Sequence, residues 1–251
     1  MRKPSLSLIV AIGLALLAPA SAVVSGDQSL LLLGAGGTRV AAGGFAYIDG
    51  EGTALGPNGG TSGTFNSVGS NLIICAVGSY SSVSLDASHI TDLETNTWTL
   101  RVGKTATGTR LQIYTAQPTS SDTNANHTVT VTLTGSFAAI VCAAFSGANA
   151  TTFDLSDTGD NTGTTVSPVT GITPSVNNAL VVSLLSSDGA QGTVTTPTGY
   201  TSVGNVAYGA ANNFPISLAY KIQGAAAAED PEWTTGNSLP QGTIVASFKP
   251  A

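Results

Sequence analysis

The stretch HTVTVTLTGSFAAIVCAAF, residues 127–145, contains two strand patterns in succession. In its first part Val129, Val131 and Leu133 alternate with threonines, which is the period of a strand with one buried face. Its second part, FAAIVCAAF at 137–145, is continuously apolar, which indicates a central strand covered on both faces. This stretch therefore predicts a β protein whose layers cover one another.

The same two patterns recur along the chain. Alternating segments are TWTLRV at 97–102, RLQIYT at 110–115 and SVSLDAS at 82–88. Continuously apolar segments are LIICAV at 72–77, ALVVSLL at 179–185 and TIVASF at 243–248. Turn signals separate them, namely GPNGG at 56–60, SDTNAN at 121–126, SDTGDNTG at 156–163 and TPTGY at 196–200. Because helical spacing is nearly absent, the sequence predicts an all-β fold, an antiparallel two-sheet β-sandwich of jelly-roll-like type.

Three regions divide the 251 residues. Residues 1–22 carry a basic start, an apolar run and the small-residue pattern Ala20-Ser21-Ala22, and are either a secretory signal peptide or a hydrophobic arm buried by a partner. Residues 23–66 are rich in glycine and form either an arm or outer strands. We place the main β-sandwich domain at residues 67–251.

The charge pattern excludes one class of partner and favours another. With eight basic residues scattered along the chain and a net charge of −6, no cluster of Lys and Arg is present to track phosphates, so we expect no nucleic-acid binding. Charged residues make up only 9% of the chain. A surface with so little charge suits burial against neighbouring proteins, and cleavage of the leader would leave no stable membrane span.

The two cysteines, Cys75 and Cys142, both lie within apolar strand-like runs. In an exported protein they would form a disulfide between two strands. The alternative is a pair of buried thiols that act as small apolar side chains. The sequence leaves both states open.

Catalytic patterns are not evident. The two histidines, His89 and His127, are most simply surface or strand-end residues, and no nucleophile elbow is present to complete a serine triad. The carboxylates, among them Asp92 and Glu229, lie mostly in turn-like segments where solvated side chains are typical, rather than as an evident glycosidase pair. We therefore expect no enzymatic activity.

Two kinds of binding site remain as hypotheses. Asp154, Asp157 and Asp160 form the densest group of oxygen ligands and either bind a calcium ion or belong to a solvated loop. For sugar binding, which requires exposed aromatic rings, the candidates are Trp233, Tyr200 and Tyr208, with Trp233 favoured because its neighbours are polar. The alternative is that these rings belong to the core.

The two halves of the main domain share a weak sequence similarity. NLIICAVGSYSSV at 71–83 and NALVVSLLSSDGA at 178–190 each begin with Asn before an apolar strand and end in a Ser-rich turn. A further apolar strand follows each of them, at 137–145 and at 243–248. Either two related sheets or chance accounts for this similarity.

The chain contains, in this order, NLIICAVGSY, TDLETNTWTL, RLQIYTAQ, HTVTVTLTGSFAAIVCAAFSG, NNALVVSLLSSDG, GYTSV, SLAYKI and IVASFKPA. In the order of these motifs it resembles a β-sandwich module of tailed-phage virion proteins and secreted bacterial surface proteins. The resemblance extends over residues 67–251 and implies structural, decorating or adhesive roles without catalytic residues.

From these observations we expect an extracellular protein, on a virion surface or secreted to a cell surface. The leading hypothesis is a structural or decorating protein on the exterior of a phage particle that contacts copies of itself or other virion proteins. The second is a secreted bacterial surface module that binds polysaccharide, and the third is a secreted hydrolase. The mature N-terminus distinguishes export, which would leave Val23, from assembly of an unprocessed chain beginning at Met1.

Overall fold

The computed structural model describes residues 43–80, 85–118, 123–134, 136–208 and 213–251. The expected leader at residues 1–22, and the glycine-rich segment as far as residue 42, lie outside the described residues. Everything below concerns the described ranges.

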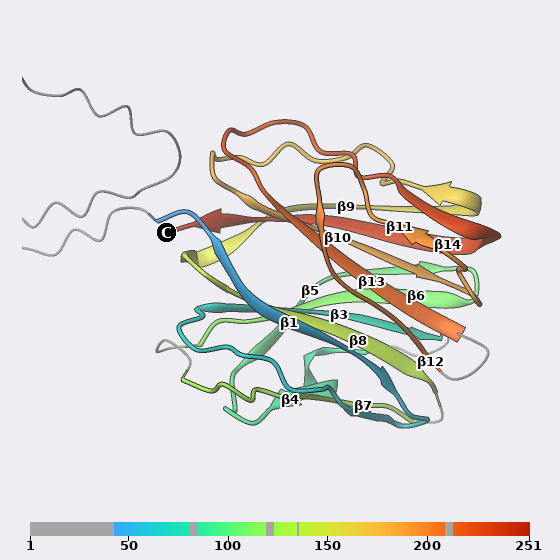
Figure 1. Cartoon of the computed structure of the whole chain (residues 1–251), viewed down its shortest axis with the longest axis horizontal. Helices are drawn as coiled ribbons and strands as arrows, with labels where there is room; N and C mark the ends of the chain where they lie inside the picture. The colour runs from blue at the N-terminus through green and yellow to red at the C-terminus, as the bar shows by residue number, and fades with distance from the viewer. Residues whose placement is uncertain (1–42, 81–84, 119–122, 135, 209–212) are drawn as a thin grey trace, which may run out of the picture. The chain divides into compact units, whose positions relative to one another are not determined.

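Strands make up nearly all of the regular structure (Figure 1). They are β1 (Ala46–Leu55), β2 (Gly59–Thr61), β3 (Leu72–Tyr80), β4 (Ile90–Asp92), β5 (Trp98–Ala106), β6 (Thr109–Ala116), β7 (Val129–Thr132), β8 (Ala138–Ser146), β9 (Ala148–Val166), β10 (Leu180–Ser187), β11 (Val194–Thr195), β12 (Thr201–Tyr208), β13 (Asn213–Ile222) and β14 (Trp233–Pro250). One 3-10 turn, η1 (Ala87–His89), precedes β4.

The strands form three antiparallel sheets. A five-stranded sheet has the order β1-β8-β3-β6-β5, and a six-stranded sheet has the order β11-β14-β10-β13-β12, with β9 paired to β14. A smaller sheet has the order β2-β7-β4. The all-β, antiparallel sandwich predicted from the sequence is confirmed.

Two cores explain why the central strands are apolar on both faces. Successive residues of a strand point to opposite sides of its sheet. On β3, Ile74 belongs to the core between the two large sheets, whereas Ile73 belongs to a second core, on the other side of the five-stranded sheet. The small sheet supplies Val129 and Val131 to this second core, so the alternating strand of residues 127–145 covers the continuously apolar one.

The two cysteines lie in this second core. Cys75 on β3 is directly opposite Cys142 on β8, and the two form a disulfide. Both residues are fully buried, in the same cluster as Val129 and Val131. Of the two states left open by the sequence, the disulfide is the one present.

Each large sheet is built from one half of the chain. The strands β3, β5, β6 and β8 lie side by side in the order β8-β3-β6-β5, and β10, β12, β13 and β14 lie in the equivalent order β14-β10-β13-β12. The chain therefore completes the five-stranded sheet before it begins the six-stranded one, whereas the chain of a jelly roll alternates between its sheets. The apolar strands that share the weak sequence similarity also occupy equivalent places. In the first half β3 is the neighbour of β8, and in the second β10 is the neighbour of β14.

The first described strand is an outer one. β1 pairs with β8 from Ala46 opposite Ser146 to Leu55 opposite Ala138, at the edge of the five-stranded sheet. The sandwich therefore includes residues on the N-terminal side of the boundary that we placed at residue 67. Gly50 and Gly52 on this strand lie against Val203 and Val206 of β12, where a side chain would collide with valine methyl groups.

Candidate functional site on the outer face of the six-stranded sheet

The face of the six-stranded sheet that points away from the five-stranded sheet has its own apolar cover. Trp233 packs there with Val166, Leu185 and Ala219, and Tyr200 packs partly against the same cluster. Trp233 is only 1% exposed, and its indole Nε1 donates a hydrogen bond to Ser183 Oγ at 2.8 Å. The expectation that Trp233 is an exposed ring is therefore wrong, because this tryptophan covers the sheet.

Next to this cluster lies a buried carboxylate, Glu229, which is 7% exposed. Its Oε2 accepts a hydrogen bond from the Tyr200 hydroxyl at 2.9 Å, and its Oε1 lies 2.6 Å from Lys221 Nζ. Gln223 Nε2 also donates to Oε1. Sequence reasoning placed Glu229 in a solvated turn, and this was wrong, because three side chains from two other segments enclose it.

These surroundings keep the Tyr200 hydroxyl protonated. Burial, assisted by the adjacent Glu229 carboxylate, raises the pKa of Tyr200, so its hydroxyl stays a hydrogen-bond donor at neutral pH. Lys221 Nζ lies 5.8 Å from the centroid of the Tyr200 ring and also pairs with Glu229. The carboxylate is thereby fixed in position by donors on both of its oxygens.

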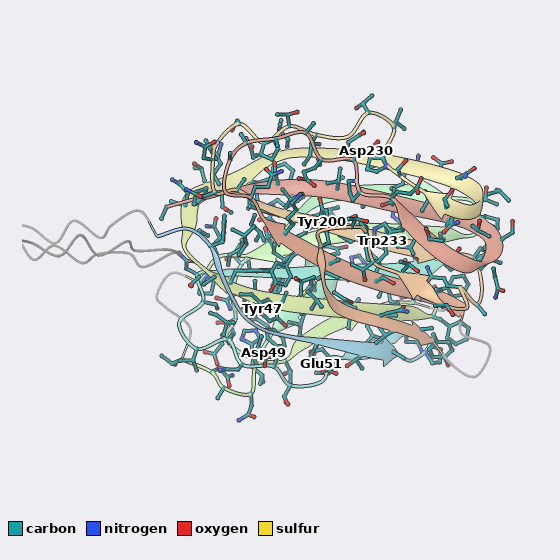
Figure 2. The ribbon with its side chains drawn as sticks, turned by 45° about the horizontal axis from the view of Figure 1, so that its top comes forward. Tyr47, Asp49, Glu51, Tyr200, Asp230 and Trp233 are labelled. Atoms are coloured by element: carbon teal, nitrogen blue, oxygen red, sulfur yellow. A yellow bond between two sulfur atoms is a disulfide. The ribbon has the colours of Figure 1, made fainter. Side chains whose placement is uncertain are left out.

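A recess of about 280 Å³ opens beside Glu229, and we call it the acidic recess. It is lined by Thr195, Thr196, Pro197, Thr198, Tyr200, Glu229, Asp230, Pro231, Glu232 and Thr234. Asp230 and Glu232 are exposed. Figure 2 labels Tyr200, Asp230 and Trp233; Tyr200 precedes β12, whereas Asp230 shortly precedes β14 and Trp233 is its first residue. Carboxylates and threonine hydroxyls in one recess supply many acceptors, and hydroxyls that both donate and accept.

The three aromatic candidates do not meet at one place. Tyr200 and Trp233 share an apolar cluster, but Tyr208 lies at the other end of β12. There its ring stacks on Phe137 with 4.3 Å between centroids. Of the three, only Tyr200 lines the acidic recess.

The aspartates proposed as calcium ligands do not converge. Their partners are Ser175 for Asp154, Thr170 and Gly171 for Asp157, and Lys104 for Asp160. Burial tends to raise the pKa of Asp154 and of Asp157, but the hydrogen bonds outweigh it and both pKa values lie below the usual value. Within the described ranges no group of three or more His, Cys, Asp or Glu side chains is placed to hold a metal ion. The calcium prediction is therefore wrong for these three residues, because each carboxylate is neutralised or hydrogen-bonded separately.

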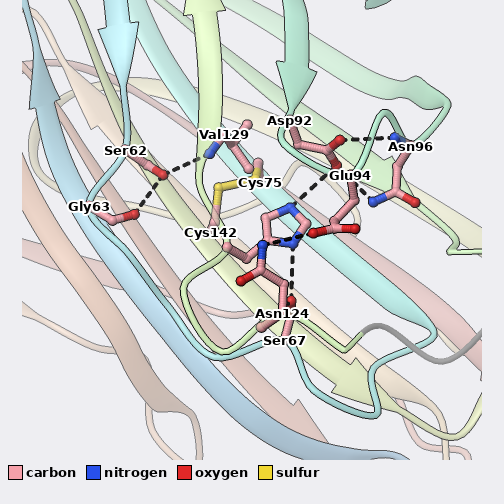
Figure 3. Close-up of polar contacts among 11 residues, drawn as sticks. Ser62, Gly63, Ser67, Cys75, Asp92, Glu94, Asn96, Asn124, Val129 and Cys142 are labelled. Atoms are coloured by element: carbon pink, nitrogen blue, oxygen red, sulfur yellow. Dashed lines mark hydrogen bonds and ion pairs between the residues drawn. A yellow bond between two sulfur atoms is a disulfide. The ribbon is translucent and has the colours of Figure 1, made fainter.

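A Ser, a His and an Asp do meet at one end of the small sheet, where β4 ends and β7 begins; Figure 3 labels Ser67 and Asp92. Ser67 Oγ lies 3.0 Å from His127 Nδ1, and His127 Nε2 lies 3.3 Å from Asp92 Oδ2. The side chains of His127 and Asp92 have no exposed surface, and Ser67 is fully buried. The interpretation of His127 as a surface residue is thus wrong, although it does stand at a strand end.

This arrangement contains the residue types of a nucleophilic triad, but its surroundings favour a structural role. A nucleophile must reach its substrate, and Ser67 has no exposed surface. Its hydroxyl also donates to the Asn124 carbonyl at 3.0 Å. The backbone of His127 pairs with that of Phe65 in both directions, so the group joins the segment before β3 to the small sheet.

Sequence reasoning missed Glu229 and the His127 group because both form between segments distant in the chain. One signal was available for Glu229: Lys221 and Gln223 stand two residues apart at the end of an apolar strand, and therefore on one face. A cation at such a position needs a carboxylate partner from another segment.

The fold and site define a β-sandwich with a small third sheet and a polar, acid-lined recess on its outer face. Searches against protein-family models, curated proteins and solved structures each found no match. In the described residues no helix is long and apolar enough to cross a membrane. Function must therefore be argued from the side chains themselves.

Proposed function

We propose that this protein is a non-enzymatic module of an exterior surface that binds polysaccharide in the acidic recess. The observation that carries the proposal is the Glu229 carboxylate, held by Tyr200 and Lys221 at the wall of a recess lined with threonines. A carboxylate is costly to bury unless several donors hold it, and Glu229 is held in this way beside an open recess.

The chemistry of the recess suits a ligand with many hydroxyl groups. Sugar hydroxyls donate to carboxylates and exchange hydrogen bonds with threonine hydroxyls. The exposed carboxylates of Asp230 and Glu232 extend these acceptors to the rim. A recess of about 280 Å³ is near the lower limit of ligand sites, which suits one unit of a longer chain that continues across the surface.

An exterior location is supported by three further features. The Cys75–Cys142 disulfide is typical of proteins that fold in an oxidising compartment. The order of strand motifs also resembles that of secreted bacterial surface proteins and phage virion proteins, and the leader-like segment at residues 1–22 is consistent with export.

The test is a glycan array followed by calorimetric titration of any glycan that binds. We expect the double variant Asp230→Asn, Glu232→Gln to lower affinity on the order of tenfold or more, since hydrogen bonds to charged groups contribute about 1.5–3 kcal/mol. Glu94→Gln, which alters an exposed carboxylate in a different part of the fold, is the matched control and should bind normally.

Circular dichroism would verify that each variant is folded. An array on which no glycan binds, or a folded double variant with full affinity, would remove the proposal.

A second candidate function is a structural or decorating role on a phage particle, in contact with copies of the chain or other virion proteins. It is favoured by aromatic rings at the end of the sandwich where β3 ends and β8 begins. Tyr80 is 45% exposed and contacts Phe214, and Phe137 is 37% exposed and stacks on Tyr208. Aromatic residues are enriched in protein–protein interfaces.

For this role we expect concentration-dependent association in sedimentation velocity that Tyr80→Ser with Phe137→Ser abolishes. A chain that stays monomeric at all concentrations, and is missing from purified particles, would contradict the decorating role.

A further inference from the structure

A second recess lies on the same outer face, and we call it the amide recess. It has a volume of about 460 Å³, and its lining includes Gln191, Asn205, Ala207, Pro215 and Asn237. Asn205 stands opposite Ser217, whose Oγ donates to Asn205 Oδ1 at 3.1 Å, and Ser217 alternates with the core-facing Ile216 and Leu218. Asn205 therefore points away from the central core, as the acidic recess does.

Gln191 is the unusual residue in this recess. It is 3% exposed, and its side-chain Nε2 and Oε1 are both buried without a hydrogen-bond partner among the described residues. Its backbone, by contrast, is paired: the backbone carbonyl of Gln191 accepts a hydrogen bond from the backbone N–H of Asn237 at 3.1 Å. Buried amides normally have partners, since leaving both a donor and an acceptor unpaired destabilises the folded protein.

The two asparagines add complementary groups. Asn205 uses Oδ1 to accept from Ser217, which leaves its Nδ2 as a donor. Asn237 uses Nδ2 to donate to the Ala190 carbonyl at 2.8 Å, which leaves its Oδ1 as an acceptor. The described lining carries no charged side chain, and Ala207 and Pro215 supply apolar surface.

We propose that the amide recess binds the acetamido group of an N-acetylated sugar. This inference rests on the proposed function and names the class of polysaccharide. An acetamido group presents one carbonyl acceptor, one N–H donor and one methyl group. Primary amides pair with the first two, and Ala207 and Pro215 suit the third. A neutral lining disfavours an ionised ligand, because the ion would lose its hydration without gaining a counter-charge.

The position of the two recesses favours a chain of sugars over a single one. Gln191, in the amide recess, precedes β11, and Thr195, in the acidic recess, is its last residue. Thr195 is four positions after Gln191, a length of chain that spans at most about 14 Å. One short oligosaccharide is therefore long enough to reach both recesses, with its acetamido group in one and its hydroxyls in the other.

The test compares two tetrasaccharides that differ only in this group, a tetramer of N-acetylglucosamine and a tetramer of glucose with the same linkage. Calorimetric titration of the full chain should show the N-acetylated tetramer binding on the order of tenfold more tightly. Gln191→Leu should remove this preference and bring the affinity for the N-acetylated tetramer down to that for the glucose tetramer. Because it replaces an unpaired buried amide with an apolar side chain of similar size, we expect it to fold.

If Gln191→Leu does not fold, a second variant, Asn205→Ala, takes its place. Asn205 is exposed, and we expect its replacement to reduce the same preference. Equal affinity for the two tetramers, or binding of neither, would overturn the acetamido inference, while binding of other glycans on the array would leave the proposed function standing. A peptide analogue, N-acetylalanine methylamide, that competes as well as the N-acetylated tetramer would show a peptide-amide site and overturn the sugar assignment.

Discussion

At the scale of single residues, the contacts of His127 fix the orientation of its ring. The Ser67 hydroxyl has one proton, which it donates to the Asn124 carbonyl, so its oxygen accepts from His127 Nδ1. His127 Nε2 faces the Asp92 carboxylate, which accepts. Each ring nitrogen of His127 therefore faces a polar partner, the Ser67 hydroxyl on one side and the Asp92 carboxylate on the other.

The Asp92 carboxylate makes the stability of this group depend on pH. Burial, the largest influence, tends to raise its pKa, but hydrogen bonds from His127 and Asn96 outweigh burial, so the pKa lies below its usual value. A carboxylate with a lowered pKa stabilises the fold above its unfolded pKa of about 3.9, and this contribution is lost as the pH falls through the folded value.

We predict that Asp92→Asn lowers the free energy of unfolding by about 3 kcal/mol at pH 7, because it removes the buried charged acceptor that His127 and Asn96 share. The difference from the unmodified protein should shrink as the pH falls from about 4 through the lower folded pKa of Asp92, where the native carboxylate becomes protonated. Urea denaturation across this pH range measures both effects.

The matched control is Asp86→Asn. Asp86 also contacts a histidine, His89 Nδ1 at 3.0 Å, but both side chains are substantially exposed. We expect only a small loss of stability, since exposed ion pairs contribute little. A loss as large as that of Asp92→Asn would show that burial of the pair is not what matters.

At the scale of elements, β1 and β12 approach closely because glycines replace side chains between them. A Cβ atom on Gly52 of β1 would lie 2.8 Å from Val206 Cγ1 of β12. One on Gly204 of β12 would lie 3.8 Å from the Gly52 Cα and 3.1 Å from Val141 Cγ1 of the neighbouring β8. Valine methyl groups cannot rotate far out of the way. Glycine at these positions lets the edges of the two large sheets pack against one another.

We therefore predict that Gly52→Ala destabilises the protein by roughly 1–3 kcal/mol through overpacking. Gly224→Ala is the control, since nothing lies within 4 Å of its Cβ position, and it should be neutral or slightly stabilising. Thermal unfolding followed by circular dichroism compares the two. Equal melting temperatures for the variants would contradict the close contact.

Sequence patterns predicted the elements best where a strand is covered. The runs at 72–77 and 179–185 became β3 and β10 because continuous apolarity allows burial on both sides. The pattern misjudged SDTGDNTG at 156–163, predicted as a turn, which lies within β9 and pairs with β14. Its aspartates and glycines favour turns locally, but a strand partnered on one side tolerates polar residues on its open side.

At the scale of the whole molecule, both halves repeat one order of strands, and the sequence indicated this repeat only faintly. Asn71 and Asn178 precede the strands that become β3 and β10, each next to the last strand of its half. The candidate site was much less predictable. Tyr200, Lys221 and Glu229 belong to different segments, and nothing local to Glu229 distinguishes it from a solvated turn residue until the fold brings Lys221 to it.

The burial of Cys75 and Cys142 limits when their disulfide can form. Both lie beneath the small β2-β7-β4 sheet with no surface open to solvent, so neither glutathione nor an oxidant has access to them once that layer has closed. The sulfur atoms must therefore be joined before the small sheet closes over them during folding. For as long as that layer stays folded, the bond is shielded from reductants in the surrounding solution.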